Sequence, residues 1–307
     1  MNILTITLNP AFDLHYYINE YHPYRESYAN DFECNVGGKG INISRALLVE
    51  NIENTAFVLV GKENSDTYIS SLQSEEISAV PLLVDGRIRE NLTIHEKDKA
   101  ETRISLDNFS LSPKAITALF NEIKHSVNEN TIILYSGRIP KGIPHERLIE
   151  FFKHLKALGA KICIDSNSFT ISDFEELVPW LVKFNADEAD NLSPGNGHGN
   201  NRYALLYKLS EIGIPHSMIS DGANDLLYSG EFDCKVTPPT ISAVSTIGSG
   251  DCLAAGFIAA YTRGEKIENC LKTAVAYGSA SCLRHGTLPP LKEDIDKLYP
   301  LIKISLF

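Results

Sequence analysis

The stretch Thr246-Ile247-Gly248-Ser249-Gly250-Asp251 leads directly into the apolar, small-residue segment Cys252-Leu253-Ala254-Ala255-Gly256-Phe257-Ile258. The two glycines lack Cβ atoms, so the loop can expose consecutive N–H groups, and the start of the following helix adds roughly half a positive charge. This combination is a cradle for an anion. A carboxylate beside it would repel a bound phosphate unless it takes a proton from the group that attacks the phosphate, so Asp251 indicates phosphoryl transfer. An ordinary helix start with a polar cap stays open as the alternative.

A second glycine cluster lies near the N-terminus, in Val36-Gly37-Gly38-Lys39-Gly40-Ile41-Asn42. Apolar residues at positions 41, 43, 46, 47 and 48 share one face of the helix that this pattern predicts. The cluster has neither the spacing of a Walker loop nor that of a G-x-G-x-x-G dinucleotide fingerprint. Two glycine cradles can hold two anions, so the chain is expected to bind more than one phosphate group.

The order of apolar and amphipathic segments predicts an α/β fold. A strand at 132–135, an amphipathic helix at 144–158 and a strand at 161–165 alternate, which is typical of a doubly wound, mainly parallel sheet with helices on both faces. The intervals of about 13–36 and 87–109 instead show β-type alternation with no helix, so we expect a small β-sheet lid there. Ligands of such sheets bind beyond the carboxyl ends of the strands, and Asp13 at the end of the first strand, Ser136, Asp165 and the Asp251 loop are expected to lie there.

Length and charge narrow the function. The 307 residues, 43% of them hydrophobic, are enough for one large core, and we expect a single domain over 1–307 that carries the lid. A net charge of −11 argues against a nucleic-acid partner. An anionic substrate must therefore be attracted by local basic groups, for which Lys39, Arg89 and Arg103 are the candidates.

The remaining composition favours a cytoplasmic protein. The six cysteines form no C-x-x-C pair, which suits reduced thiols. The N-terminus lacks a basic region followed by a long apolar one, and no run approaches the roughly 20 apolar residues of a membrane span. The nine histidines show no zinc-ligand spacing, so no zinc and no membrane partner are expected.

The early Gly-Gly-Lys-Gly-x-Asn and the late Gly-x-Gly-Asp, in this order, resemble the corresponding elements of the ribokinase-like PfkB carbohydrate kinases. Further segments match that family in chain order over nearly the whole sequence. They are Asn9-Pro10-Ala11-Phe12-Asp13 after the apolar run 3–8, the segments 89–94 and 101–104, Ser136-Gly137-Arg138-Ile139-Pro140-Lys141-Gly142, Lys183-Phe184-Asn185-Ala186-Asp187-Glu188 and Ser220-Asp221-Gly222-Ala223. The resemblance implies a ribokinase-like fold, a sugar kinase that uses ATP and Mg²⁺, and a lid that offers a homodimer contact.

The resemblance also implies roles on the acceptor side. Asp251 would take the proton of the attacking hydroxyl, while the loop amides stabilise the transferring phosphoryl group. Asp13 and Asn42 would bind sugar hydroxyls, although a first-turn Asn can also satisfy a helix end. Arg89 and Arg103 would clamp a phosphate from one face of a hairpin, with a solvated strand face as the alternative. The full set of expected catalytic and substrate contacts is Gly248, Ser249, Gly250, Asp251, Asp13, Gly37, Gly38, Lys39, Asn42, Arg89, Arg103, Ser136 and Arg138.

On the nucleotide side the resemblance implies a pocket shaped mainly by backbone. Its expected residues are Lys183, Ser220, Asp221, Gly222 and Ser279, the last on a helix expected over 273–284. Helix packing explains Ser279 nearly as well. Asn185 and Glu188 would act on Mg²⁺ through its water shell, with plain exposed polarity as the alternative. Whether a monovalent cation such as potassium tunes the anion loop is left open.

The paired arginines, Thr7-Leu8-Asn9-Pro10-Ala11 and Arg89-x-Asn91 resemble one subset of the family, the fructose-1-phosphate and tagatose-6-phosphate kinases. A ketohexose 1,6-bisphosphate is the implied product. The chain departs from that subset at 26–30, where an expected basic contact is missing unless Arg25 supplies it. Arg138 replaces a small polar residue of the Ser-Gly-Ser turn, which either compensates for this loss or indicates a different acid or phosphate.

Three smaller departures accompany these. Phe184 replaces a proline and could alter specificity, Ser249 replaces an alanine but should preserve the loop's amides, and the Asn/Gly-rich segment 195–201 has no counterpart that can be interpreted.

Three other functions are the alternatives. A ribokinase-type kinase of an unphosphorylated sugar or nucleoside differs from the leading hypothesis in having no use for paired arginines. A catalytically silent sugar-phosphate-binding protein would have no need of the base Asp251. A dinucleotide-dependent dehydrogenase would need a glycine fingerprint in the first βα turn, which the chain lacks.

Overall fold

A ten-stranded sheet runs through the centre of the computed structural model, which describes residues 1–97, 99, 101–107, 109–193 and 201–307. Within these residues its order is β14-β13-β12-β11-β10-β9-β8-β1-β4-β5. The pairings from β5 to β11 are parallel and those from β11 to β14 are antiparallel. The strands are β1 (Asn2–Thr7), β4 (Thr55–Gly61), β5 (Ala79–Val84), β8 (Thr131–Ser136), β9 (Lys161–Asp165), β10 (Leu181–Asn185), β11 (His216–Ser220), β12 (Leu226–Ser229), β13 (Cys234–Thr237) and β14 (Lys303–Leu306).

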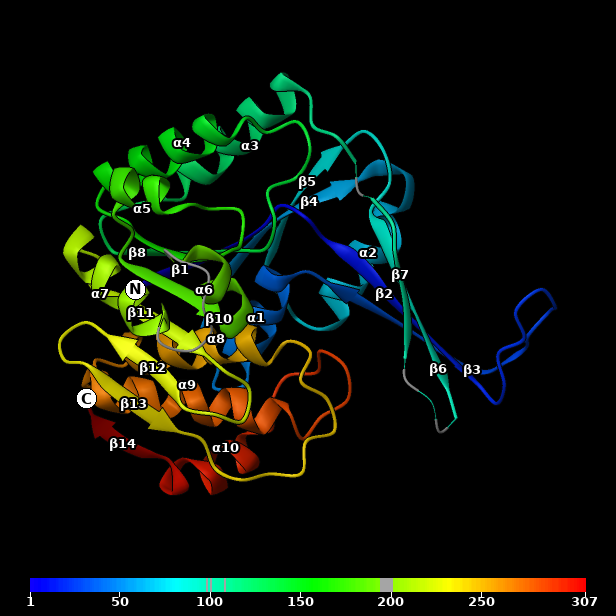
Figure 1. Cartoon of the computed structure of the whole chain (residues 1–307). Coiled ribbons are helices and arrows are strands. Elements are labelled where there is room, and N and C mark those ends of the chain that lie inside the picture. Colours follow the sequence, from blue (N-terminus) through cyan, green and yellow to red (C-terminus); the bar gives the residue numbers. More distant parts are fainter. Residues whose placement is uncertain (98, 100, 108, 194–200) are drawn as a thin grey trace.

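Helices cover both faces of this sheet (Figure 1). One layer contains α3, α4, α5 and α7, whose core residues include Leu119, Phe152 and Leu205, and the other contains α1, α8, α9 and α10 around Phe257 and Leu271. Strands buried from both sides read as near-continuous apolar runs, and every residue of β8 is buried. The predicted doubly wound, mainly parallel α/β fold is confirmed. The helices are α1 (Lys39–Leu48), α2 (Ser65–Ser74), α3 (Pro113–His125), α4 (His145–Ala157), α5 (Ile171–Leu177), α6 (Ala186–Leu192), α7 (Asn201–Ile212), α8 (Ser249–Thr262), α9 (Ile267–Ser281) and α10 (Lys292–Leu298), with 3₁₀ turns η1 (Lys62–Asn64) and η2 (Tyr299–Leu301).

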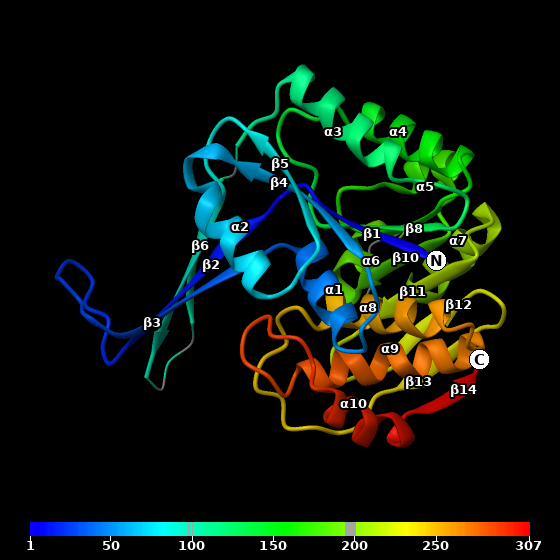
Figure 2. The same cartoon turned by 180° about the vertical axis from the view of Figure 1, so that it is seen from behind.

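A second, four-stranded sheet projects from one end of these layers, as both views show (Figures 1 and 2). Its order is β3-β2-β6-β7, and it is called the lid sheet below. Side chains at alternate positions share a face, and the register places Asp13 beside Asn91 and Thr93 beside Arg103. The strands are β2 (Ala11–Ile18), β3 (Ala29–Gly37), β6 (Arg89–Glu96) and β7 (Thr102–Ser105), which fall within or beside the segments predicted to form the lid.

The structure corrects two expected positions. Asp13 does not follow the first strand directly, because β1 ends at Thr7 and the chain turns through Pro10 into lid strand β2, where Asp13 is the third residue. The apolar run had suggested a longer first strand because Leu8 is buried in the turn itself. The helix expected over 273–284 begins earlier, at Ile267, since the residues before 273 also alternate buried and exposed around the helix.

Two smaller observations concern the whole chain. All six cysteines are free, and Cys163, Cys234, Cys252 and Cys270 are buried. Among the helices that the structure describes, none has the length and apolar character needed to span a bilayer. Most of the segment 195–201 lies outside the described residues.

Candidate active site

Asp251 occupies the first turn of α8, directly after the glycine loop. Gly248 caps this helix in the left-handed conformation, with φ of 77°, which a glycine adopts without steric cost. The first amides of a helix have no partner within it. The Ser249 amide donates to the Thr246 carbonyl over 3.3 Å, and Gly250 and Asp251 line a pocket described below. The Ser249 hydroxyl donates to the Thr246 carbonyl over 2.9 Å and leaves those amides free of its side chain. The glycine loop and the carboxylate thus meet where the sequence predicted.

The Asp251 carboxylate is buried, with 4% of its residue surface exposed. Burial raises its pKa to about 6, and Asp165 adds to the rise, while Lys39, Lys183 and a hydrogen bond from Asn42 oppose it. The Asn42 amide nitrogen donates to Asp251 Oδ2 over 2.8 Å. A carboxylate that titrates near pH 6 is ionised at neutral pH and still basic enough to accept a proton.

Asp165, at the carboxyl end of β9, forms the second anionic centre. Its Oδ1 lies 3.5 Å from Lys39 Nζ and 3.4 Å from Lys183 Nζ, and its Oδ2 accepts a hydrogen bond from Ser136 over 3.3 Å. Burial by itself would raise the pKa of this carboxyl, but the two lysines hold it below its usual range. No role for Asp165 followed from the sequence. Its signal was its place at the end of a buried strand, the edge at which ligands bind.

Lys39 and Lys183 approach the anion loop from two sides. Burial alone would lower the pKa of the Lys39 amine, and Asp165, Asp251 and Glu188 together raise it. Lys183 is 3% exposed, and a Cβ added to Gly250 would lie 2.8 Å from its Nζ. Both lysines line a pocket of about 400 Å³ with Gly248, Gly250 and Asp251. It is called the cationic pocket below after these two lysines, although Asp187 and Asp221 also line it. Two lysines at a helix N-terminus suit a transferring phosphoryl group.

The early glycine cluster forms the turn before α1, whose N-terminal cap is Gly38. A Cβ on Gly37 would lie 2.3 Å from Asp13 Oδ2, so this glycine is required for the close approach of the carboxylate to the backbone. Asp13 Oδ1 accepts a hydrogen bond from the Asn91 amide over 2.8 Å. Asn42 uses its side chain on Asp251 rather than on the helix end, which argues against the alternative of a simple helix-end residue.

The two lid arginines have different surroundings. Both lie on the Asp13 face of the lid sheet, but Arg103 pairs with Thr93, four residues along β6 from Arg89, or about 13 Å at the usual rise of a strand. Arg103 donates to Glu101 over 2.8 Å and lines a separate pocket with His15 and His95. In this conformation the structure does not bring the two guanidiniums to one point.

Arg89 has Arg138 as its cationic neighbour instead. Its Nε is buried without a hydrogen-bond partner. Burial lowers the pKa of the Arg89 guanidinium, Asp13 opposes this change and Arg138 adds to it. Arg138 itself is exposed in the turn after Ser136. Two neighbouring guanidinium groups, one of them with an unsatisfied buried donor, form a candidate site for an anion.

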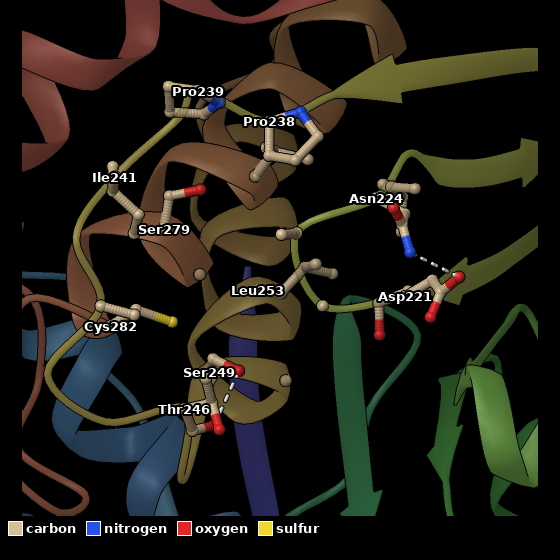
Figure 3. A pocket seen from close by; sticks show the side chains of 18 of the residues that line it. Asp221, Asn224, Pro238, Pro239, Ile241, Thr246, Ser249, Leu253, Ser279 and Cys282 are labelled. Carbon is tan, nitrogen blue, oxygen red and sulfur yellow. Dashed lines mark hydrogen bonds between the residues drawn. The ribbon is translucent and has the colours of Figure 1, made fainter.

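A second pocket, of about 250 Å³, also adjoins the anion loop and shares Ser249 and Gly250 with the first (Figure 3). Its apolar walls come from Pro238, Ile241, Leu253 and Val275, and Ser279 points into it from α9. The predicted residues Ser220, Asp221 and Gly222 line both this pocket and the cationic one. Arg202 Nη1 and Asn224 Nδ2 both donate to Asp221 Oδ2, over 2.7 Å and 3.1 Å.

Asn185 and Glu188 begin α6 and cap it reciprocally. The Asn185 side-chain oxygen accepts from the Glu188 amide, and Glu188 Oε2 accepts from the Asn185 amide. The other carboxylate oxygen of Glu188, Oε1, takes no part in this cap and lies 4.0 Å from Lys39 Nζ. Within the described residues no cluster of three or more His, Cys, Asp or Glu side chains is arranged to hold a metal. As an oxygen donor, Glu188 Oε1 suits a hard cation that keeps most of its waters.

Comparison with known proteins adds independent findings. A family model described as pfkB family carbohydrate kinase matches residues 7–294. The 1-phosphofructokinase of Escherichia coli strain K12 is 29% identical over 279 residues, 89% of this chain and 88% of that protein. That of Bacillus subtilis strain 168 is 28% identical over 313 residues, 99% of each. The structure of phosphofructokinase-2 from Escherichia coli in complex with potassium superposes with a TM-score of 0.89 over 98% of both chains, at 22% identity, which supports the fold alone.

Proposed function

Because the chain belongs to the pfkB family of carbohydrate kinases, we propose that it phosphorylates a phosphorylated ketohexose, with fructose 1-phosphate as the first candidate and tagatose 6-phosphate as the second. Family membership itself makes the protein an ATP-dependent sugar kinase. The finer proposal is supported by the names of the relatives, which are 1-phosphofructokinases. The observation that carries the proposed reaction is the burial of Asp251 between the cationic pocket and the glycine turn beside Asp13.

In the proposed reaction the acceptor hydroxyl attacks the γ-phosphorus of ATP. The bond from that phosphorus to the β–γ bridging oxygen breaks, the hydroxyl proton passes to Asp251, and ADP and a ketohexose 1,6-bisphosphate leave. The amides of Gly248, Ser249 and Gly250 stabilise the charge on the transferring group. Asp251 is placed for this task because it shares the helix start with those amides.

We assign ATP, the phosphoryl donor, to the pocket shown in Figure 3. The apolar walls suit a purine ring, and Ser279 supplies a polar contact from α9. Ser249 and Gly250 line the same pocket, so a phosphate chain that leaves it reaches the start of α8 directly. The Lys183 and Lys39 amines would then balance the negative charge of the phosphates.

Mg²⁺ would be held by Glu188, with Asn185 and water beside it, and would neutralise charge on the ATP phosphates. A monovalent cation near the anion loop stays a prediction. The potassium in the complex of Escherichia coli phosphofructokinase-2 belongs to that protein.

On the acceptor side we propose that Asp13 and Asn42 bind sugar hydroxyls beside Gly37 and Gly38, with Ser136 close by. Arg89 and Arg138 are the groups that would bind the phosphate already on the sugar, since Arg89 has an unsatisfied buried donor and lies near both Asp13 and Arg138. Arg103 lies farther along the lid sheet and lines another pocket, so we propose that it contributes less to binding this phosphate. This arrangement favours a phosphorylated acceptor over the ribokinase-type alternative.

We further propose a homodimer through the outer face of the lid sheet, in a cytoplasmic protein. That face is opposite Asp13 and exposes Phe32 and Ile104, which are 49% and 52% accessible. Sedimentation of the wild-type protein and of Ile104→Glu tests it: a dimer that becomes a monomer in the variant supports the contact.

The decisive experiment is ATP consumption by the purified protein with Mg²⁺ on fructose 1-phosphate, tagatose 6-phosphate, fructose 6-phosphate, fructose, ribose and adenosine. Turnover of one phosphorylated ketohexose is the expected result and identifies the substrate. Activity confined to neutral acceptors would overturn the proposal in favour of a ribokinase-type kinase. Sugar-phosphate binding without turnover would favour a silent binding protein.

A further inference from the structure

Asn42 is held between the base and a cation. Its amide nitrogen donates to Asp251 Oδ2 over 2.8 Å, and its amide oxygen accepts from Arg45 Nη1 over 3.2 Å. A guanidinium can only donate and an ionised carboxylate can only accept, so these two partners leave the amide one orientation. Without Arg45, the amide could rotate and turn its oxygen toward Asp251.

Arg45 is itself fixed from two further elements. Its Nε and Nη2 form an ion pair with Glu75, at the end of α2, with Nη2 3.1 Å from Glu75 Oε1. Nη2 also donates to the carbonyl of Val36 on lid strand β3, over 3.1 Å. The Arg45 side chain is only 12% exposed. The guanidinium therefore ties α1, α2 and the root of the lid sheet together, while its Nη1 donates to Asn42.

We propose that Arg45 is a positioning residue for the reaction: held by Glu75, it orients the Asn42 amide so that its nitrogen donates to Asp251. This inference rests on the proposed role of Asp251 as the base. Arg45 acts through the amide of Asn42, whereas the charged groups that face Asp251 are Lys39 from α1, Asp165 from β9 and Lys183 from β10. A neutral hydrogen bond aligns one carboxylate oxygen and leaves Oδ1 for the acceptor hydroxyl.

The consequence concerns how strongly Asp251 holds a proton. A hydrogen bond donated to a carboxylate stabilises its ionised form. If the Asn42 amide loses its orientation, Asp251 holds its proton to higher pH and less base is available near neutrality. A residue that merely supported the fold would change stability without moving this titration.

The test compares Arg45→Met/Glu75→Gln with Glu75→Gln alone. Replacing both members of the ion pair avoids leaving the Glu75 carboxylate without its partner, and the single variant isolates the contribution of Arg45. The first measurement is the ¹³C NMR titration of the Asp251 carboxyl in the free protein, assigned with Asp251→Asn. We expect the pKa of Asp251 to rise by about half a unit or more in the double variant relative to Glu75→Gln.

The second measurement is the pH profile of kcat, with Asn42→Ala as the matched background. We expect the acid limb to move to higher pH, and kcat at pH 5 to fall about three- to tenfold for a shift of about half a unit to one unit. In the Asn42→Ala background, replacing Arg45 should change kcat by less than about twofold, because the amide through which Arg45 acts is already absent.

An unchanged Asp251 titration, or effects of the Arg45 and Asn42 replacements that multiply, would overturn the inference. The NMR titration needs no substrate. If the wild-type protein turned over none of the sugars, the proposed function would fail while the titration still decided whether Arg45 acts on Asp251.

Discussion

Lys183 Nζ lies 3.4 Å from Asp165 Oδ1, and both residues are almost fully buried, Asp165 at the end of β9 and Lys183 in the middle of the neighbouring strand β10. The same amine lies beside Gly250, where it supports the anion loop from within the protein. A buried ion pair is costly to form, so its place directly under the candidate phosphate site points to a functional use. The loop, the lysine and the carboxylate should therefore respond together to substitution.

Asp165→Asn should lower the free energy of unfolding by about 3–5 kcal/mol at pH 7, since it leaves Lys183 buried without an anionic partner. The folded pKa of Asp165 is depressed, so its contribution is fully present above the unfolded value of 3.8 and is lost only as the pH falls through the folded value. Denaturant unfolding measures the effect. Asp187→Asn, at an exposed position nearby, is the control, and equal losses for the two variants would contradict the prediction.

Asp251→Asn should lower kcat by at least about 100-fold with little change in the affinity for the sugar phosphate, because the amide cannot take the hydroxyl proton. Steady-state kinetics and binding of the sugar phosphate without ATP separate the two effects. Ser249→Ala keeps the loop amides and should stay within about threefold of the wild type. A variant at 251 that kept most of its turnover would exclude this residue as the base.

The same Asp251→Asn replacement should stabilise the fold at pH 8. The folded pKa of about 6 exceeds the unfolded value of 3.8, so the carboxyl destabilises the native state increasingly as the pH rises between these values. The difference corresponds to at most about 3 kcal/mol, a value that already includes the attraction to Lys39. Thermal unfolding at pH 8 and at pH 4 should show the variant's advantage at the higher pH only. An advantage that is the same at both pH values would rule out this cause.

Below about pH 6, kcat/KM of the wild type should fall as Asp251 becomes protonated. The profile should be measured with the free enzyme's stability checked at each pH. Activity that stays level down to pH 4 would show that the base titrates elsewhere.

Arg138→Ala should raise KM for a phosphorylated ketohexose by about tenfold or more and leave any rate on an unphosphorylated sugar nearly unchanged. Arg103→Ala should have the smaller effect, because Arg103 is paired with Glu101 and lines another pocket. Arg87→Ala, at an exposed arginine that pairs with Glu90, is the matched control. The reverse ranking of Arg103 and Arg138 would restore the clamp predicted from the sequence.

The sequence was most informative where function depends on local backbone. Gly248 and Asp251 are three residues apart, so a helix start with a carboxylate in its first turn followed from the motif, as did the turn before α1. Alternating segments predicted the layers for the same reason, since burial on both faces leaves a continuous apolar strand. Asp13 was placed on the wrong element because an apolar run does not reveal where a chain turns into a second sheet.

The contacts across the fold were beyond the sequence. Asn42 reaches Asp251 across 209 positions, and Lys39 reaches Asp165 across 126, contacts that depend on the meeting of α1, α8 and β9. The same holds for Arg89, whose cationic neighbour is Arg138 rather than the Arg103 that strand alternation suggested. Which residues are candidates to bind an anion or accept a proton followed from the amino-acid order, because those properties belong to the residue and its immediate backbone. Their partners, burial and pKa came from folding, because these depend on side chains brought together from distant segments.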